Sequence, residues 1–203
     1  MIKNNTLKPI MAGITILLGS GTLVEAAPPA RSHMVTAGRT SQPIGHAVFC
    51  RQFAAECKVR SSSTRPTRLT RSRWSELVEI NNQINRAVEP VTDLEYYKKE
   101  EFWTYPERYG DCEDYVLLKR YMLIQKGWPE SSLLITVVRQ PNGDGHAVLT
   151  VRTDRADYIL DNLKSRIRPW NETEYRYLKR QSTKNTGRWT AIRDNRFNLA
   201  RSG

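Results

Sequence analysis

Between residues 111 and 163 the hydrophobic pattern changes from a helical period to a strand period. Asp111 is a good N-cap for the apolar helix that follows it, and Gly127 and Pro129 end that helix. Runs rich in β-branched residues come next, separated by short turn sequences, at 133–139, 146–152 and 158–163. Successive strands joined by short loops pair antiparallel. The pattern therefore predicts an α+β domain in which the helix packs on an antiparallel meander.

The segments on either side of this unit extend the domain, which we expect over residues 70–203. Apolar positions at helical spacing predict a helix over 72–88 that Pro90 ends. Near the C-terminus, TEYRYLKRQ and RWTAIR predict one or two further short strands. Residues 27–69 are rich in Pro, Ser, Thr, Arg and Gly and have no clear period. We expect them to form an irregular basic N-terminal arm.

The first 26 residues have the pattern of a secretory signal peptide. Lys3 and Lys8 come before or within the start of an apolar run, and Val24-Glu25-Ala26 fits a small-x-small cleavage site. A membrane anchor is the alternative, but glycines interrupt the run, which is short for a span of about 20 apolar residues. We therefore expect an exported protein, periplasmic or secreted, that does not span the membrane once the signal is cleaved.

The chain has a formal net charge of +11, which could indicate a nucleic-acid partner. Loss of the signal peptide removes two lysines and one glutamate and leaves +10. The basic residues are spread along the chain, with one concentration at 58–73, and no recognisable nucleic-acid motif accompanies them. We interpret the charge as favouring solubility or attraction to anionic envelope surfaces, and we expect no nucleic-acid binding.

The three cysteines divide into a pair and a single thiol. An oxidising compartment permits disulfides, and Cys50 and Cys57 are close enough in sequence to bridge one local turn. Cys112 is then the free thiol. An inert buried cysteine is one interpretation of it, and a reactive nucleophile is the other.

Cys112 lies in YGDCEDY, where Asp111, Glu113 and Asp114 surround it with negative charge. Such charge disfavours the thiolate, whereas the partial positive charge of a helix N-terminus favours it. Asp114 follows Asp111 by three residues, which predicts a capping box. If Cys112 is catalytic, something has to offset the charge of the remaining acids.

A histidine and an aspartate in the predicted meander complete a possible catalytic set. His146 and Asp161 stand opposite each other, with Cβ atoms within ~5 Å, if the hairpin between them is centred near residues 153 and 154. A turn is expected there because the sequence is RTDRAD. Cys112 would be the nucleophile, His146 the base and Asp161 the group that orients the imidazole, with the Cys112 N–H directed toward an oxyanion.

Taken singly, each of these residues is more often structural, and it is their combination that fits one mechanism. A complication is that Gly-His-Ala-Val occurs twice, at 45–48 and at 145–148. The first copy falls in the predicted irregular arm. We interpret it as a coincidence and His46 as structural or exposed.

The blocks GDCEDYVLLKRYML, GHAVLTV and YILDNL, in this order and spacing, resemble the bacterial transglutaminase-like cysteine proteinases, the group that includes the LapG-type periplasmic proteases. The resemblance covers roughly residues 70 to 193. Outside the three blocks it extends to aromatic, amide and neighbouring residues, namely Trp74, Asn81, Asn85, Trp103, Pro106, Glu107 and the region of Trp189.

This resemblance implies a papain-like thiol protease fold with a Cys112, His146 and Asp161 triad. It also implies calcium dependence, with Asp111 and Glu113 as the calcium-binding acids. LapG-type members release large biofilm adhesins by cleaving their N-terminal retention region, and an inner-membrane cyclic-di-GMP receptor sequesters them. A surface adhesin and such a receptor are therefore the substrate and partner that the resemblance implies.

Two other functions use the same residues or the same fold. An acyl-enzyme on Cys112 can be resolved by an amine in place of water, which is the transglutaminase reaction. A non-catalytic binding module that keeps the fold for recognition belongs to a different class. The sequence favours a cysteine endopeptidase over both.

Overall fold

The computed structural model of the chain describes Met1 and residues 32–197. Apart from Met1, the predicted signal peptide lies outside the described residues. No helix in the described part of the chain is long and apolar enough to cross a membrane. The helices are α1 (Ile44–Gln52), α2 (Arg71–Ala87), α3 (Asp93–Tyr96) and α4 (Cys112–Gln125), with short 3-10 turns at Glu130–Ser132, Trp170–Glu172 and Asn195–Phe197. The strands are β1 (Thr36–Thr40), β2 (Glu89–Pro90), β3 (Tyr109–Gly110), β4 (Leu133–Arg139), β5 (Gly145–Arg152), β6 (Asp157–Leu160), β7 (Arg168–Pro169), β8 (Arg176–Ser182) and β9 (Asn185–Ile192).

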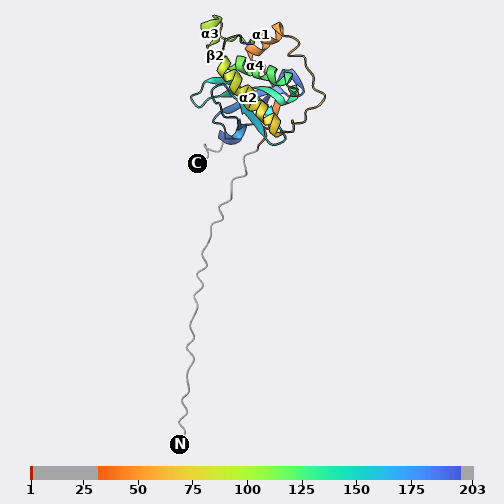
Figure 1. The fold of residues 1–203 in the computed structure, drawn as a ribbon, viewed down its shortest axis with the longest axis vertical. Coiled ribbons are helices and arrows are strands. Elements are labelled where there is room, and N and C mark those ends of the chain that lie inside the picture. The colour runs from red at the N-terminus through yellow and green to blue at the C-terminus, as the bar shows by residue number, and fades with distance from the viewer. Residues whose placement is uncertain (2–31, 198–203) are drawn as a thin grey trace.

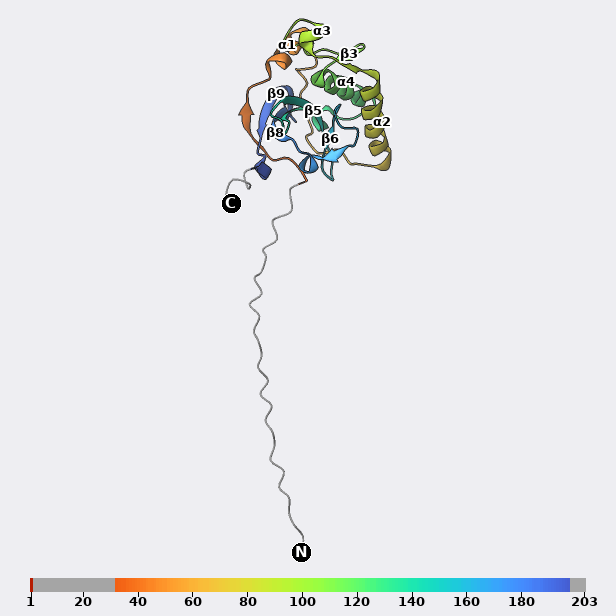
Figure 2. The ribbon, with the colours of Figure 1, turned by 90° about the vertical axis from the view of Figure 1, so that its left-hand side faces the viewer.

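A seven-stranded antiparallel sheet in the order β1-β9-β8-β4-β5-β6-β7 forms the centre of the fold (Figures 1 and 2). The predicted meander is present as β4-β5-β6, and the two C-terminal strands are present as β8 and β9. Because β8 pairs with β4 on the side away from β5, the chain extends the sheet in both directions from β4. Helices and antiparallel strands together make the predicted α+β fold.

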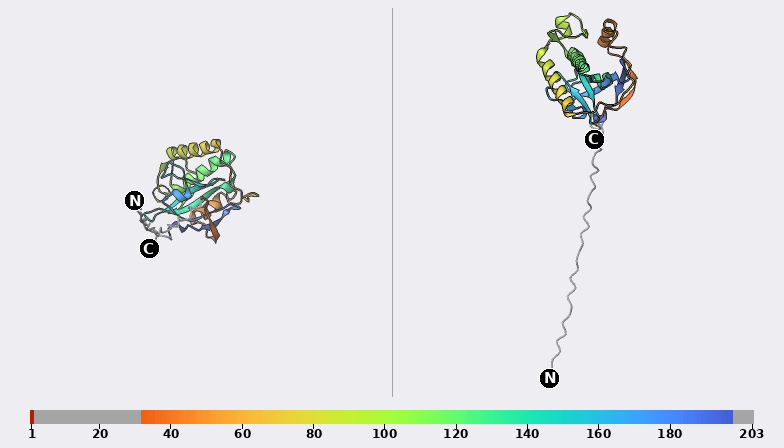
Figure 3. Two further views of the ribbon diagram at one scale, coloured as in Figure 1. Left: turned by 90° about the horizontal axis from the view of Figure 1, so that it is seen from below. Right: turned by 45° about the vertical axis from the view of Figure 1, so that its right-hand side comes forward.

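Two helices cover one face of the sheet, with α4 against β4 and β5 and α2 against α4 (Figure 3, left). The central strands β4 and β5 are buried on both faces, and their successive residues point to opposite sides of the sheet. Leu149 of β5 packs in the cluster beneath the helices together with Leu117 of α4. Its neighbour Val148 packs in a second cluster on the other face with Trp170 and Tyr177. This packing fixes α4, and therefore Cys112, against the strand that carries His146.

The prediction of an irregular arm over 27–69 is wrong for residues 36–52. In this region β1 pairs antiparallel with β9 and α1 follows it. Cys50 and Cys57 are joined by a disulfide with an S–S distance of 2.02 Å. Phe49 of α1 is 1% exposed, so tertiary packing stabilises a short helix whose own composition gives little sign of it. The packed domain therefore starts N-terminal to the expected boundary.

The predicted register of the β5-β6 hairpin is also wrong. The ladder pairs Leu149 with Leu160 and Arg152 with Asp157, so the turn is centred between residues 154 and 155. Continued by one residue, this ladder sets Asp161 beside Val148 and not beside His146. The physical reason is the turn itself, in which the Thr153 hydroxyl accepts the N–H groups of both Arg155 and Ala156. His146 and Asp161 are therefore diagonal neighbours, a separation that long polar side chains still span.

Candidate active site

Cys112 is the first residue of α4, at the end of the helix where backbone N–H groups have no helical acceptor. Asp111 occupies the N-cap position in an extended conformation, but its side chain makes no capping hydrogen bond. Its Oδ2 instead accepts the N–H of Asp93 at 3.4 Å. The reciprocal capping box that the sequence predicts for Asp111 and Asp114 therefore does not form.

The Cys112 thiol has two hydrogen-bond partners. Its Sγ accepts the backbone N–H of Ala147 at 3.3 Å and donates to Glu113 Oε2 at 3.2 Å. Burial raises the pKa of the thiol well above its ordinary value, and the negative charges of Glu113 and Asp111 raise it further. The N–H of Ala147 acts in the opposite direction. In this arrangement Cys112 is a protonated thiol.

His146 and Asp161 are joined by a hydrogen bond between Nε2 and Oδ1, 2.9 Å apart. Both side chains are 3% exposed. Burial alone raises the pKa of Asp161, but the hydrogen bond and charge of His146 outweigh it, and the net pKa is lowered. Asp161 is therefore an ionised carboxylate. The sequence predicted Asp161 within the strand, but the structure places it directly after the end of β6.

Three further groups hold the Asp161 residue in place. Its Oδ2 accepts the Tyr175 hydroxyl at 2.5 Å, and its Oδ1 also accepts the Leu163 N–H at 2.9 Å. From the helical layer, the Asn85 side-chain amide donates to its backbone carbonyl at 2.8 Å. The Tyr175 ring also lies 5.5 Å from the His146 ring. Sequence reasoning missed Tyr175, because nothing in NETEYRY distinguishes a carboxylate-binding tyrosine from one in the core.

The structure brings the three predicted catalytic residues to one place but does not connect all of them. Ala147, which contacts Sγ, is the residue next to His146 on β5, so the thiol lies at the start of this strand. Among the described residues, however, no hydrogen bond joins Sγ to the His146 ring. Since Nε2 is engaged with Asp161, Nδ1 is the ring nitrogen that has no hydrogen-bond partner among the described residues.

An acidic cluster lies beside Cys112, made of Asp93, Asp111 and Glu113. One carboxylate oxygen of each lies within 4.8 Å of the others. Asp93 was missed by sequence reasoning. Its nearest signal is the capping box of Thr92 and Glu95, which marks the start of α3 and which the structure contains.

The carboxylate oxygens of this cluster outnumber the hydrogen-bond donors around them. Burial raises the pKa of Asp93 to about 6, even though its carboxylate accepts the Phe102 N–H, and burial followed by the charge of Asp111 also raises that of Glu113. The buried Oδ1 atoms of Asp93 and Asp111 have no hydrogen-bond donor. Three carboxylates whose oxygens approach within 4.8 Å of one another, two of them with a buried oxygen that lacks a donor, match the hard oxygen ligands that Ca²⁺ takes. The residues present therefore fit a divalent cation.

Asp114 has a structural place next to this cluster. It is fully buried, and its Oδ1 accepts the Thr104 N–H at 2.9 Å, which holds the loop before α4. Burial raises the pKa of Asp114 to about 8, although the Thr104 N–H opposes this. A Cβ on Gly110 would lie 2.8 Å from Asp114 Oδ2. The glycine of the GDC sequence is thus required by this close approach.

Comparison with known proteins adds a family to this geometry. Residues 36–197, which are most of the chain, match the family described as "Bacterial transglutaminase-like cysteine proteinase". No curated protein matches the chain.

Several solved structures are similar, among them three of LapG from Legionella pneumophila. The calcium-bound structure has a TM-score of 0.48 and 24% identity, covering 53% of this chain and 64% of its own, so this chain spans less than two thirds of it. The EGTA-treated structure has a TM-score of 0.51 and 23% identity, covering 60% and 68%. A third has a TM-score of 0.50 and 24% identity, covering 62% and 71%. At these identities the latter two establish a shared fold.

Proposed function

The chain belongs to the bacterial transglutaminase-like cysteine proteinases, and from that premise we propose that it is a cysteine endopeptidase with Cys112 as nucleophile, His146 as base and Asp161 as the orienting carboxylate. The observation that carries this proposal is the buried 2.9 Å hydrogen bond between His146 and Asp161, which lies one residue from the contact between Ala147 and the thiol. The α+β fold with a cysteine at the start of its central helix supports it.

Acylation follows from the groups in the site. The thiol turns from Glu113 to His146 and transfers its proton to Nδ1, and Sγ attacks the carbonyl carbon of the scissile peptide. The imidazolium formed in this step is stabilised by the Asp161 carboxylate on Nε2. The C–N bond then breaks, the leaving amine takes the proton from His146, and a thioester on Cys112 remains.

Deacylation uses the same residues in reverse. His146 takes a proton from water, the hydroxide attacks the thioester carbon, and the C–S bond breaks to release the carboxylic acid and regenerate the thiol. The oxyanion of each tetrahedral intermediate would be stabilised by the Cys112 backbone N–H at the start of α4. No second donor for the oxyanion is assigned.

We also propose that Asp93, Asp111 and Glu113 hold a calcium ion. Bound there, the ion would supply positive charge that offsets the acids around the thiol. Glu113, once engaged in the cluster, no longer accepts the thiol proton, which leaves that proton for His146. The donor-free Oδ1 atoms of Asp93 and Asp111 support this set of ligands.

The triad is tested by the rate at which iodoacetamide alkylates Cys112, followed by mass spectrometry, and by cleavage of a peptide library. Cys112→Ala should abolish cleavage, and His146→Ala should abolish cleavage and slow alkylation. Asp161→Asn should have a smaller effect of the same kind. Equal alkylation rates in the wild type and in His146→Ala would contradict the mechanism.

The calcium site is tested separately by titration calorimetry and by alkylation with calcium or with a chelator. We expect calcium binding, faster alkylation when calcium is present, and loss of both in Asp111→Asn with Glu113→Gln. Asp93→Asn should weaken calcium binding as well. Asp144→Asn removes an exposed acid from the β4-β5 turn and is the matched control. Unchanged calcium binding in Asp93→Asn would remove that residue from the ligand set.

The finer features of the proposed function rest on the family and on the sequence. We propose that the protein is exported to the periplasm or secreted and that its substrate is a protein, with a large surface adhesin as a candidate and a cyclic-di-GMP receptor as a candidate regulator. Amine transfer remains the alternative reaction. Incubation of the acyl-enzyme with and without a primary amine separates them, because a stable amide product in place of hydrolysis indicates transfer.

A further inference from the structure

The segment from Asp161 to Arg168, which links β6 to β7 and is here called the 161–168 segment, borders a cavity of about 310 Å³. The cavity lies at the aspartate end of the proposed triad, because Asp161 and its hydrogen-bond donor Tyr175 both line it. The charged side chains that line the remainder are Lys164, Arg166, Arg168 and Glu174. None of these four takes part in the proposed chemistry.

The three basic side chains of this cavity are free to bind a ligand. Lys164, Arg166 and Arg168 are all exposed, and among the described residues none of them forms a salt bridge or a side-chain hydrogen bond. Glu174 is the one acid that lines the cavity besides Asp161, and Asp161 is occupied by His146 and Tyr175. The cavity mouth therefore has an excess of positive charge.

The backbone that carries these cations is fixed at several points. Asn85 of α2 donates to the carbonyl of Asp161 at 2.8 Å, and Asn81, one helical turn earlier, donates to the carbonyl of Ser165 at 3.2 Å. At its end the segment pairs with β6, where Arg168 is opposite Ile159. Because the backbone is already held at these points, binding a ligand would order only the side chains of the cations and not the segment that carries them.

The charge of the cavity lining indicates the chemistry of the ligand. Ile167 is buried between Arg166 and Arg168, whereas both arginines are exposed and line the cavity together with Lys164. Arginine also binds carboxylates in a bidentate manner.

We propose that this cavity is a subsite for an acidic stretch of the polypeptide substrate. The inference rests on the proposed function, since it concerns the substrate of that same site. Neither Cys112 nor His146 lines the cavity, so the subsite would bind residues of the substrate other than those at the scissile bond. Its contribution is to substrate affinity, and it raises no group's reactivity.

The experiment measures binding without catalysis. Cys112→Ala protein is titrated into a fluorescein-labelled peptide in which glutamate alternates with alanine, and into the same peptide with glutamine in place of glutamate. We expect the glutamate peptide to bind at least about tenfold more tightly, and to bind less tightly as salt is raised. Lys164→Gln with Arg166→Gln and Arg168→Gln should remove most of this difference.

The matched control neutralises three other exposed basic residues, by Arg65→Gln with Arg68→Gln and Arg71→Gln. It makes the same change in net charge near the start of α2, about 20 Å along that helix from Asn85. The control should keep the preference for the glutamate peptide. An equal loss in both triple variants would mean that only the overall charge attracts the peptide, and it would overturn the proposal. So would tighter binding of a labelled oligothymidylate at the same residues.

The two proposals fail in different ways. If His146→Ala leaves alkylation of Cys112 unchanged, the endopeptidase mechanism fails, while the peptide titration still reports on the cavity. If the peptide titration shows no preference for glutamate, the subsite fails and the triad is untouched. With a cleaved sequence in hand, neutralising the three cations should raise KM and leave kcat unchanged.

Discussion

The tetrapeptide Gly-His-Ala-Val occurs twice in this protein and adopts two different structures. At 45–48 it lies in helix α1, where the N–H of Ala47 donates to the carbonyl of Pro43 one turn back. At 145–148 it lies in strand β5, where the N–H of Ala147 donates to the Cys112 thiol. Identical local sequence therefore decides neither the secondary structure nor the role of the histidine. The surrounding structure decides both.

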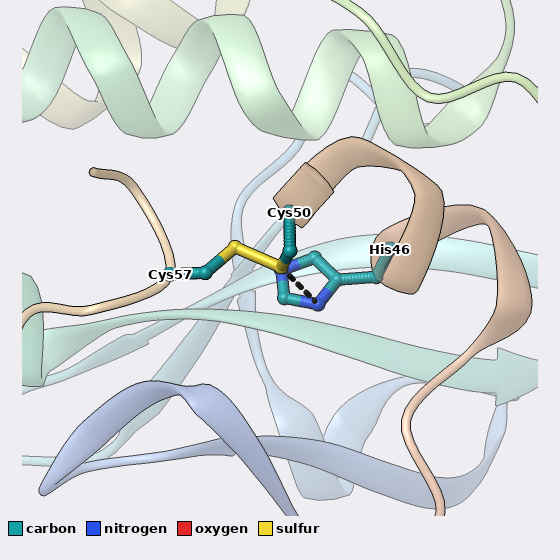
Figure 4. Close-up of side chains that lie close together, drawn as sticks. All are labelled: His46, Cys50 and Cys57. Atoms are coloured by element: carbon teal, nitrogen blue, oxygen red, sulfur yellow. Dashed lines mark hydrogen bonds between the residues drawn. A yellow bond between two sulfur atoms is a disulfide. The ribbon is translucent and has the colours of Figure 1, made fainter. Parts of the chain in front are cut away.

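His46 has neutral hydrogen-bond partners. It is 1% exposed, and its ring nitrogens contact the side chains of Gln42, Gln181 and Trp189. Figure 4 shows the ring lying against the disulfide. Its Nδ1 is 3.6 Å from Cys50 Sγ. Because the sulfurs are bonded to each other, they are not metal ligands. Burial, followed by the charge of Arg120, lowers the pKa of His46 to about 4, so the ring is neutral and structural.

His146 is equally buried but has a charged partner. Asp161 is an ionised carboxylate at 2.9 Å, and Tyr175 supports it. An anion at this position stabilises an imidazolium, which the neutral partners of His46 do not. The comparison teaches that the charge state open to a buried histidine depends on the side chain to which it is hydrogen-bonded. A lone histidine in a sequence does not reveal that group.

The largest expected effect comes from the same substitution in both copies. His146→Gln should slow alkylation of Cys112 by roughly 10²–10⁴-fold, the usual contribution of a general base. His46→Gln should leave the rate nearly unchanged, because His46 does not face the thiol. The rates are measured by mass spectrometry of the Cys112 peptide, with near-UV circular dichroism as a check that both variants are folded. A comparable loss in both would end the distinction between them.

The pH dependence of stability is the next largest effect. The folded state keeps His46 neutral down to about pH 4, while the unfolded chain takes up a proton near pH 6.5, so acid favours unfolding in this window. At roughly 1.4 kcal/mol per pH unit over this window, the effect is at most about 3.5 kcal/mol, and it is constant below pH 4. Urea unfolding at pH 7 and pH 4 should show the wild type losing more stability than His46→Gln. An identical loss in both proteins would contradict the buried neutral state.

Removal of the disulfide separates stability from chemistry. Cys50→Ala with Cys57→Ala opens a short loop and should lower the free energy of unfolding by about 2 kcal/mol. The urea midpoint measures this change. Alkylation of Cys112 in the folded variant should proceed at the wild-type rate, because the disulfide lies beside His46 and not beside His146. A slower rate would show that the two regions are coupled.

The glycines of the two copies provide the smallest test. A Cβ at Gly45 would lie 2.4 Å from the Trp103 ring, whereas one at Gly145 would meet nothing within 4 Å. Gly45→Ala should therefore destabilise the protein by about 1–2 kcal/mol through overpacking. Gly145→Ala should change stability by less than about 0.5 kcal/mol. Thermal unfolding of the two variants side by side measures this, and similar midpoints would be evidence against the tight contact at Trp103.

Much of the fold could be predicted because the hydrophobic period is a local property. The helices expected at 72–88 and after Asp111 are α2 and α4, and the three runs of β-branched residues are β4 to β6. Helix α1 was missed because its stability comes from burying Phe49 and from the disulfide. The apolar pattern also did not predict that two cations of α4 are buried. Lys119 and Arg120 are 0% and 2% exposed. Arg120 is held there by Glu56 and Glu130, from segments that no helical pattern connects.

The candidate site could be predicted in composition but not in geometry. Cys112, His146 and Asp161 stood out as a free thiol, a histidine opening a predicted strand and a nearby acid. The register of the strands that carry His146 and Asp161 could not be predicted, because the turn at Thr153 shifts the pairing by two residues. The third acid of the cluster, Asp93, comes from a different element 18 residues before Asp111. Only packing brings such residues together.

The sequence by itself determined which segments are helix and which are strand across most of the domain, and it singled out one thiol without a nearby cysteine partner. These properties depend on residues that are close along the chain. The tertiary structure alone decided which histidine faces a carboxylate, that Asp93 joins the acids beside the thiol, and that the thiol accepts the N–H of Ala147. Each of these depends on atoms that are far apart in sequence, and their distances are set by side-chain packing and strand register.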